Sequence, residues 1–147
     1  FTSPEDAGDV AAYDFVSPIA DPPSAVTVDL DAGTATGAGT DSLTGIESAS
    51  GTQLNDTLTG DAGRNRLQGL DGSDNLDGLA GDDLLDGDAV IFGQNFPGTD
   101  DLDGGPGTAD ICLGGETTTN CESTTSPFPP PPGIGYLLRA GVVYGIV

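Results

Sequence analysis

The stretch that decides the fold is GLDGSDNLDGLAGDDLLD, residues 69–86, which consists of two consecutive nine-residue units that begin at Gly69 and Gly78. Each unit has a second Gly at its fourth place, an Asp at its sixth place and a Leu at its eighth place. Self-similarity at a fixed period is the signature of repeat architectures, in which each unit buries its apolar side chain against neighbouring units. Further units are therefore expected on both sides of this pair.

The same pattern continues in both directions along the chain. Its units cover residues 51–59, 60–68, 69–77, 78–86, 87–103 with an insertion at residues 90–97, and 104–112. The insertion, VIFGQNFP, is apolar and suits either a contact surface for another module or a loop that folds back over the repeats. The second interpretation is favoured.

The eighth place of every unit is apolar, and most of its neighbours are polar. Alternation of one apolar residue with polar ones indicates a short strand with a single inward side chain, so each unit is predicted to end in such a strand. Leu84 departs from this alternation. The predicted inward residues are Leu58, Leu67, Leu76, Leu85, Leu102 and Ile111.

The turns between these strands carry the candidate metal ligands. Glycine at the first and fourth places permits positive φ and close approach of the backbone. Such turns can direct carbonyl oxygens inward, and Ca²⁺ takes about six to eight oxygen ligands. The residues predicted to hold a cation are Asp56, Asn65, Gly69, Asp71, Gly72, Asp74, Gly78, Gly81, Asp83, Gly87, Asp88, Gly98, Asp100, Gly105 and Gly107.

The units in residues 51–112 resemble the hemolysin-type (RTX) calcium-binding nonapeptide repeat of bacteria, G-G-x-G-x-D-x-U-x. The resemblance extends more loosely back to about Val10, through VTVDLDAGTATGAGTDSLTGIE at residues 26–47. It implies an all-β fold, a parallel β-roll (β-solenoid) with two nonapeptides per turn. It also implies calcium in the glycine-rich turns and short strands between them.

Two units per turn would place alternate units on the same edge of the roll. The first edge is fully acidic and is expected to hold calcium better than the second, which has one carboxylate and has Arg64 and Arg66 beside its amide. A disordered Gly- and Asp-rich tract is the alternative, but it does not account for Leu or Ile at every eighth place. The sixth-place residues are Asp56, Asp74 and Asp100 on the first edge, and Asn65, Asp83 and Ala109 on the second.

Composition excludes several functions. The net charge is −21, from 24 acidic and 3 basic residues, which excludes a nucleic-acid-binding surface and opposes compaction by self-repulsion. Histidine and lysine are absent, so there is neither a His-based triad nor a P-loop. Composition alone does not exclude a hydrolase that uses a pair of carboxylates. Their regular placement favours calcium ligation, and the chain is expected not to be an enzyme.

Two cysteines close the repeat region. Cys112 and Cys121 lie near each other in an acidic, polar chain with a calcium motif, which suggests an oxidising extracellular setting. The segment CLGGETTTNCE, residues 112–122, resembles the capping end of some bacterial calcium-binding repeat proteins. That resemblance implies a disulfide, and two free thiols are the alternative.

The regions outside the repeats are expected to be caps and tails. Irregular strands in residues 1–50 should cover the start of the roll, because an open solenoid end exposes core and backbone. No signal-peptide pattern is present, so a signal has been removed or the chain is a fragment. The tail is too short and Gly-rich to span a bilayer. The predicted segments are strands at 10–16, 26–30 and 43–46, a C-terminal cap at 113–125, and a Pro-rich linker with an apolar tail at 126–147.

These features predict a calcium-binding structural module of a secreted or cell-surface bacterial protein that folds when calcium binds outside the cell. Its expected partners are calcium ions and an adjoining domain or cell-surface partner. One alternative is a non-catalytic piece of a larger secreted hydrolase or adhesin. Another is a flat-faced solenoid that binds ice or a surface, which would need regular Thr ladders, and only Thr57 and Thr59 fit.

Overall fold

The computed structural model describes residues 10–13, 24–37, 39–88, 90–91, 94–95, 98–124, 135–139 and 142–146. All regular secondary structure in these residues is β, and no helix among them could cross a membrane. The strands are β1 Val10–Ala12, β2 Thr27–Asp29, β3 Thr34–Thr36, β4 Thr40–Ser42, β5 Ser48–Ser50, β6 Thr57–Thr59, β7 Arg66–Leu70, β8 Asn75–Asp77, β9 Leu84–Asp88, β10 Val90–Ile91, β11 Gln94–Asn95, β12 Asp101–Asp103, β13 Ile111–Leu113, β14 Thr117–Thr119, β15 Gly135–Arg139 and β16 Val142–Ile146.

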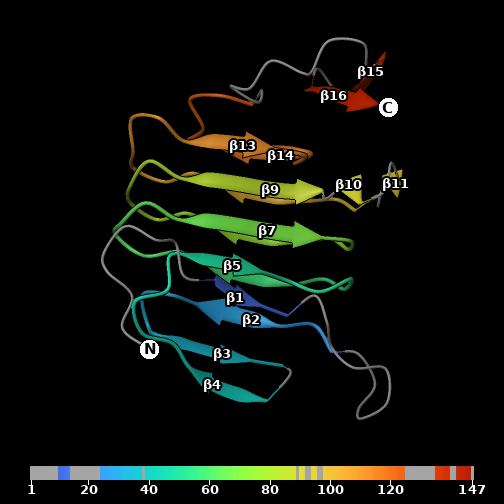
Figure 1. Cartoon of the computed structure of the whole chain (residues 1–147). Coiled ribbons are helices and arrows are strands. Elements are labelled where there is room, and N and C mark those ends of the chain that lie inside the picture. Colours follow the sequence, from blue (N-terminus) through green and yellow to red (C-terminus); the bar gives the residue numbers. More distant parts are fainter. Residues whose placement is uncertain are drawn as a thin grey trace.

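Two sheets contain the repeats, with their strands stacked along the length of the molecule (Figure 1). The first sheet has the order β1-β5-β7-β9-β13, and all of its pairs are parallel. The second has the order β14-β12-β8-β6-β2-β3-β4, and its pairs are parallel except those of β3 with β2 and β4. This all-β arrangement of parallel strands is consistent with the predicted β-roll.

Successive units contribute strands to the two sheets in alternation. β6, β8 and β12 pair in that order in the second sheet, and β7, β9 and β13 pair in that order in the first. Each unit therefore pairs with the unit two places further along the chain. This pairing brings equivalent turns of alternate units next to each other.

The core is a narrow column of inward side chains between the two sheets. Leu58, Leu76 and Leu102 lie in register in the second sheet, and Leu67 and Leu85 lie in register in the first. All five are 0% exposed. Full burial of such a side chain contributes roughly 1.5–3 kcal/mol. The predicted inward leucines are thus confirmed.

The last inward residue was predicted wrongly. Cys112, rather than Ile111, occupies the inward place: it is 1% exposed and pairs with Leu85, whereas Ile111 is only partly buried. The final unit has one extra residue in its turn, because five residues lie between Gly104 and Asp110 and only four between Gly78 and Asp83. The extra residue shifts the register of the strand by one place.

The N-terminal strands agree with the prediction in part. β2 confirms a strand within residues 26–30, and β1 confirms one at residues 10–12 of the predicted 10–16, with Tyr13 outside it and residues 14–16 not described. The predicted strand at residues 43–46 is absent, since strands occur on either side of it, at β4 and β5. These two strands belong to different sheets, so residues 43–47 must cross between the sheets, and Gly45 has φ 63° in that crossing.

The insertion and the tail each contain a hairpin. β10 pairs antiparallel with β11, and β15 pairs antiparallel with β16. The predicted packing of residues 90–97 over the roll and the predicted Pro-rich linker at residues 126–132 depend on residues outside those that the structure describes.

Candidate metal centre

The sixth-place side chains form two buried rows beside the sheets. Asp56, Asp74 and Asp100 follow one another in the first row, whose units enter the second sheet. Asn65, Asp83 and Asp110 form the second row. All six residues are at most 2% exposed.

Each row is held together by hydrogen bonds from main chain to side chain. The backbone N–H of each sixth-place residue donates to Oδ1 of the next residue in its row. The donor–acceptor distances are 2.8 Å for Asp56 to Asp74, 2.8 Å for Asp74 to Asp100, 2.7 Å for Asn65 to Asp83 and 2.7 Å for Asp83 to Asp110. One oxygen of each accepting carboxylate is thereby fixed within the turn.

The second oxygen of four carboxylates is buried without a hydrogen-bond partner. These atoms are Oδ2 of Asp74, Asp83, Asp100 and Asp110. An unpaired buried charge costs several kcal/mol, so a carboxylate in this position either becomes protonated or binds a cation. The four oxygens are therefore the atoms in the rows at which a bound cation would stabilise the ionised carboxylate.

Burial makes the charged forms of these carboxylates unfavourable. It raises the pKa of Asp74 to about 7 and that of Asp83 to about 6, and neighbouring carboxylates in the same row add to both shifts. Burial also raises the pKa values of Asp100 and Asp110, and the charges of Glu116 and Glu122, respectively, add to these shifts. A bound cation would reverse this effect, because it stabilises the ionised carboxylate.

The first-place glycines leave room for the carboxylates. A Cβ atom on Gly78 would lie 2.6 Å from Asp83 Oδ2 and 2.9 Å from the carbonyl oxygen of Gly104. A Cβ on Gly87 would lie 2.6 Å from Asp100 Oδ2, and one on Gly69 would collide with Asp74 Oδ2. Each glycine thus allows carboxylate and carbonyl oxygens to gather close to the main chain.

The fourth-place glycines bring the turns of alternate units together. A Cβ on Gly72, Gly81, Gly98 or Gly107 would collide with a main-chain carbonyl of the unit two places earlier. A Cβ on Gly105 would collide with the carbonyl of Leu79 in the same way. In the described part of the chain, no three acidic or sulfur side chains are grouped to hold a metal by themselves. An ion here would therefore need carbonyl ligands, which Ca²⁺ accepts readily.

The first sixth-place residue differs from the four described above, because both of its carboxylate oxygens accept hydrogen bonds. Asp56 Oδ1 accepts from Val26 N–H at 2.7 Å, and Oδ2 accepts from Thr52 N–H at 2.5 Å. The Thr52 hydroxyl is 3.1 Å from each oxygen. Asp56, a predicted metal ligand, thus connects the first repeat to the N-terminal strands by hydrogen bonds.

Asn65 is also engaged by protein groups. Its Oδ1 accepts from Asp61 N–H at 2.7 Å, and its Nδ2 donates to Asp61 Oδ1 at 3.2 Å. The amide suits this place because it can donate to one carboxylate and accept from an N–H at the same time. Asn65 thus differs from Asp83 in that its side chain is already engaged by Asp61, whereas Asp83 Oδ2 has no partner. This difference does not depend on the predicted effect of Arg64 and Arg66 on a cation.

The direction of the second-place N–H group separates the units of Asp56 and Asn65 from those of Asp83 and Asp110. In the first two units it points inward, from Thr52 to Asp56 and from Asp61 to Asn65. Leu79 instead has φ 64°, and its N–H donates to Oδ1 of the outer residue Asp77 at 3.0 Å.

Gly105 repeats this outward arrangement. It has φ 78°, and its N–H donates to Oδ1 of Asp103 at 3.0 Å. An Asp, Asp77 or Asp103, stands just before the first-place glycine of these two units, whereas Ser50, Thr59 and Gln68 stand there before the first three units.

Asp110 was missed by the sequence analysis, which placed Ala109 at the sixth place of the last unit. The extra residue in that turn puts Asp110 in the row instead, 2.7 Å from Asp83 N–H through Oδ1. The second edge therefore has two carboxylates with an unpartnered oxygen, Asp83 and Asp110, just as the first edge has Asp74 and Asp100. The predicted placement of Ala109 in the second edge was wrong, and the weaker calcium binding of that edge stays a prediction without this support.

The remaining predicted residues lie near the rows. Asp71 is partly exposed, and its charge adds to the raised pKa of Asp74. Asp88 is 4% exposed at the end of β9, where it pairs with Leu70. Leu70 also has positive φ, at 90°, so a bulky residue adopts the left-handed region at this second place as well.

The predicted disulfide is present between Cys112 and Cys121, with a Cα–Cα distance of 5.9 Å. Cys112 is the last inward residue of the core, so the bond connects the cap directly to the core column.

Reduction of this disulfide is expected to loosen the C-terminal turn and leave the central repeats intact. Amide hydrogen exchange with and without reductant measures this: exchange should accelerate at residues 111–123 and stay unchanged at β6–β8. A chain with two free thiols in its oxidised preparation, or uniform acceleration along all strands, would contradict the anchoring role.

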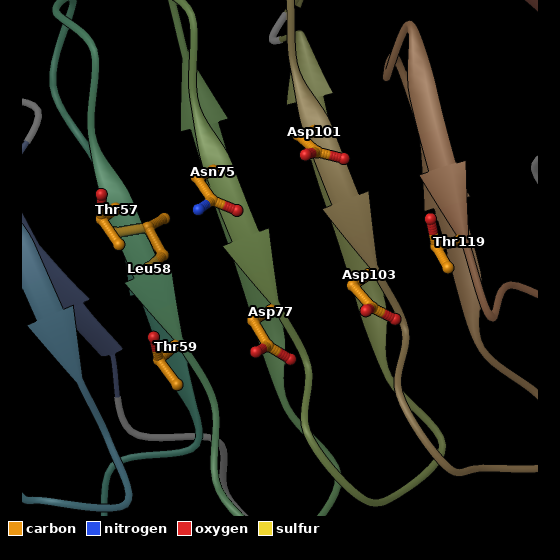
Figure 2. Close-up of a pocket in the computed structure, with 8 residues that line it drawn as sticks. All are labelled: Thr57, Leu58, Thr59, Asn75, Asp77, Asp101, Asp103 and Thr119. Atoms are coloured by element: carbon orange, nitrogen blue, oxygen red, sulfur yellow. The ribbon is translucent and has the colours of Figure 1, made fainter.

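A hollow lies on the outer face of the second sheet (Figure 2). Its outward side chains form two rows across the strands, with Thr57, Asn75 and Asp101 in one of them. The strand register places Thr27 and Thr36 in line with Thr57, two Thr residues more than the sequence indicated. Asn75 in β8 and Asp101 in β12 interrupt this row of Thr side chains. The residues that line the hollow are Thr57, Leu58, Thr59, Asn75, Asp77, Asp101, Asp103 and Thr119.

Comparison with known families agrees with the predicted repeat. Residues 50–89 match the RTX calcium-binding nonapeptide repeat, in four copies. The match includes Asp74 and Asp83 with their first- and fourth-place glycines, and it ends just before the insertion. No curated protein matches the chain.

Proposed function

Residues 50–89 are RTX calcium-binding nonapeptide repeats, and from that premise we propose that the chain is a calcium-binding structural module whose folding depends on the ion. One observation carries the proposal: four buried carboxylates each keep one oxygen without a partner. The residues fit calcium, because carboxylate and carbonyl oxygens are the ligands that this ion prefers. The site residues that we propose on each row are Asp74 with Asp100, and Asp83 with Asp110.

We propose further that two nonapeptides make one turn of a β-roll. The support is the pairing of each unit with the second unit after it, together with hydrogen bonds that connect sixth-place residues 18 positions apart, such as Asp56 with Asp74 and Asn65 with Asp83. On this arrangement, each cation lies between consecutive coils.

The chain's own groups prepare these sites. The N–H of one coil fixes the carboxylate of the next through Oδ1, which leaves Oδ2 directed away from that bond. The first-place glycine has no side chain, so the space beside Oδ2 stays free. Calcium, when bound, supplies the positive charge that two rows of neighbouring carboxylates lack.

The proposed setting is outside the cell, as part of a secreted or cell-surface protein. A disulfide and a strongly acidic composition support it, since disulfides persist in oxidising compartments. We also propose that the module is not catalytic. In support, the described sixth-place carboxylates are engaged in hydrogen bonds to backbone N–H groups, which suits a structural role better than proton transfer.

Equilibrium dialysis tests the proposal directly. The chain is expected to bind several calcium ions at millimolar calcium and to bind far less magnesium, because magnesium demands tighter octahedral geometry. The matched comparison is the same dialysis with magnesium at equal ionic strength. If calcium uptake does not saturate and is no larger than the net charge alone attracts, the proposal is wrong.

A further inference from the structure

The two acid rows do not stop at the last repeat. Asp100 N–H donates to Oε2 of Glu116 at 2.9 Å, and Asp110 N–H donates to Oε2 of Glu122 at 2.7 Å. These bonds repeat those that connect earlier members of each row, except that the acceptor is now a Glu in the cap. Glu116 therefore extends the row of Asp100, and Glu122 extends the row of Asp110.

The main chain of the cap follows the same pattern as the repeats. In the repeats, the residue after the sixth place donates its N–H to the sixth-place carbonyl two units earlier, as Asn75 does to Asp56 at 3.0 Å. Thr117 donates to the Asp100 carbonyl at 3.1 Å, and Ser123 donates to the Asp110 carbonyl at 3.0 Å. Glu116 and Glu122 thus occupy sixth places of two further, degenerate units.

A carbonyl of the cap also takes a repeat position. Gly104 N–H donates to the Thr119 carbonyl at 3.0 Å, as Gly78 N–H donates to the Asp103 carbonyl at 2.8 Å. A Cβ on Gly104 would collide with the carbonyl of Asn120, and a Cβ on Gly78 would lie 2.9 Å from that of Gly104. Asn120 has φ 51°, which suits a short left-handed turn.

The length of the cap turns explains why Glu stands where the repeats have Asp. Six residues, 78–83, separate β8 from β9, whereas three residues, 114–116, separate β13 from β14. The shorter turn cannot follow the full path of a repeat. A Glu side chain has one more methylene than Asp, so its carboxylate can still reach the N–H of the preceding coil.

We propose that Glu116 and Glu122 are ligands of two terminal calcium sites, which they complete with Asp100 and Asp110. This inference rests on the proposed function. Asp100 is 1% exposed and Asp110 is 0% exposed, and Oδ2 of each is buried without a partner at the end of its row. Among the described residues, Glu116 and Glu122 are the carboxylates that follow Asp100 and Asp110 in the two rows, so the cap provides the next oxygens. Both glutamates are exposed, which makes the terminal sites the most open and the weakest.

The test uses Glu116→Gln and Glu122→Gln in the full chain. The amide keeps an oxygen that can accept the N–H of Asp100 or Asp110, but it carries no charge. Each variant is expected to lose calcium at saturation in equilibrium dialysis, or to bind its last ion roughly tenfold more weakly, because ligand charge sets affinity. Circular dichroism at saturating calcium should remain that of the wild type. Asp31→Asn is the control, since it removes one exposed charge outside both rows.

A purely capping role makes a different prediction. If Glu116 and Glu122 only accept hydrogen bonds, both variants will bind as many calcium ions as the wild type, with the same affinities, which overturns the inference and leaves the proposed function intact. If the wild type binds no calcium, both the inference and the proposed function are wrong. For a variant that does not fold, NMR titration of the wild type decides: amide signals of residues 100, 110, 116 and 122 should saturate last. Saturation together with the central repeats overturns the inference.

Discussion

In excess chelator the far-UV circular dichroism of this chain is expected to lose its β signal, and millimolar calcium is expected to restore it. A net charge of −21 opposes compaction, and the roll additionally buries four carboxylates that each have an unpartnered oxygen. Each repeat strand contributes one inward apolar side chain to the core, so burial of apolar surface offsets little of these costs. Metal binding should therefore supply most of the folding free energy, as it does in small metal-dependent domains.

The controls separate specific ligation from charge screening. Magnesium and sodium chloride at matched ionic strength should leave the chain largely unfolded, because screening reduces repulsion between exposed charges but does not pair buried ones. A spectrum that does not change on chelation would refute the coupling. Full recovery of β structure in sodium chloride would show that repulsion alone kept the chain open.

The regular part of the fold could be predicted because each strand depends on one inward residue. A Leu at the eighth place identifies β6, β7, β8, β9 and β12 without any structure, and in all of them but β9 both of its neighbours are polar. The strand of the last repeat, β13, could not be placed in this way, because Gly104 and Gly105 are both acceptable first places and both Ile111 and Cys112 suit a buried position. The structure selects Cys112, and with it Asp110.

The metal site was predictable in composition but not in detail. The motif identifies every sixth-place residue except Asp110, yet it does not distinguish Asp56, whose two oxygens both accept hydrogen bonds, from Asp74, whose Oδ2 has no partner. Glu116 and Glu122 lie outside the motif and become visible only when the rows are followed through hydrogen bonds. Asn65 was predicted to hold a cation, but its amide donates to Asp61, so Asn65→Asp would place two carboxylates against each other.

The second large effect is expected from the same substitution at two sixth places of one row, Asp74→Asn and Asp56→Asn, because only Asp74 has an oxygen without a partner. Asp74→Asn retains an oxygen that can accept Asp56 N–H but removes the charge of the oxygen that has no partner. We expect the calcium midpoint of folding to rise at least about tenfold, which corresponds to about 1.4 kcal/mol. The number of bound ions should also fall, since Asp74 lies inside its row, between Asp56 and Asp100.

Asp56→Asn should behave differently, although it is the same change in the same row. Both oxygens of Asp56 already accept N–H groups from Val26 and Thr52, so an amide at this place turns an NH₂ group toward one of these donors. The variant should be less stable at every calcium concentration, because a buried N–H loses its acceptor. It should nevertheless bind as many calcium ions at saturation as the wild type.

Dialysis and circular dichroism of the two variants therefore separate three interpretations of the acidic rows. If unpartnered oxygens are the ligands, only Asp74→Asn loses ions. If every sixth-place residue is a ligand, both variants lose ions equally, and the hydrogen bonds of Asp56 are no guide to metal binding. If the acids are merely solvated charge, Asp74→Asn relieves repulsion and folds in less calcium than the wild type, because the removed charge had no ion to hold. The third result would also refute calcium ligation by Asp74, whatever the total amount of calcium bound.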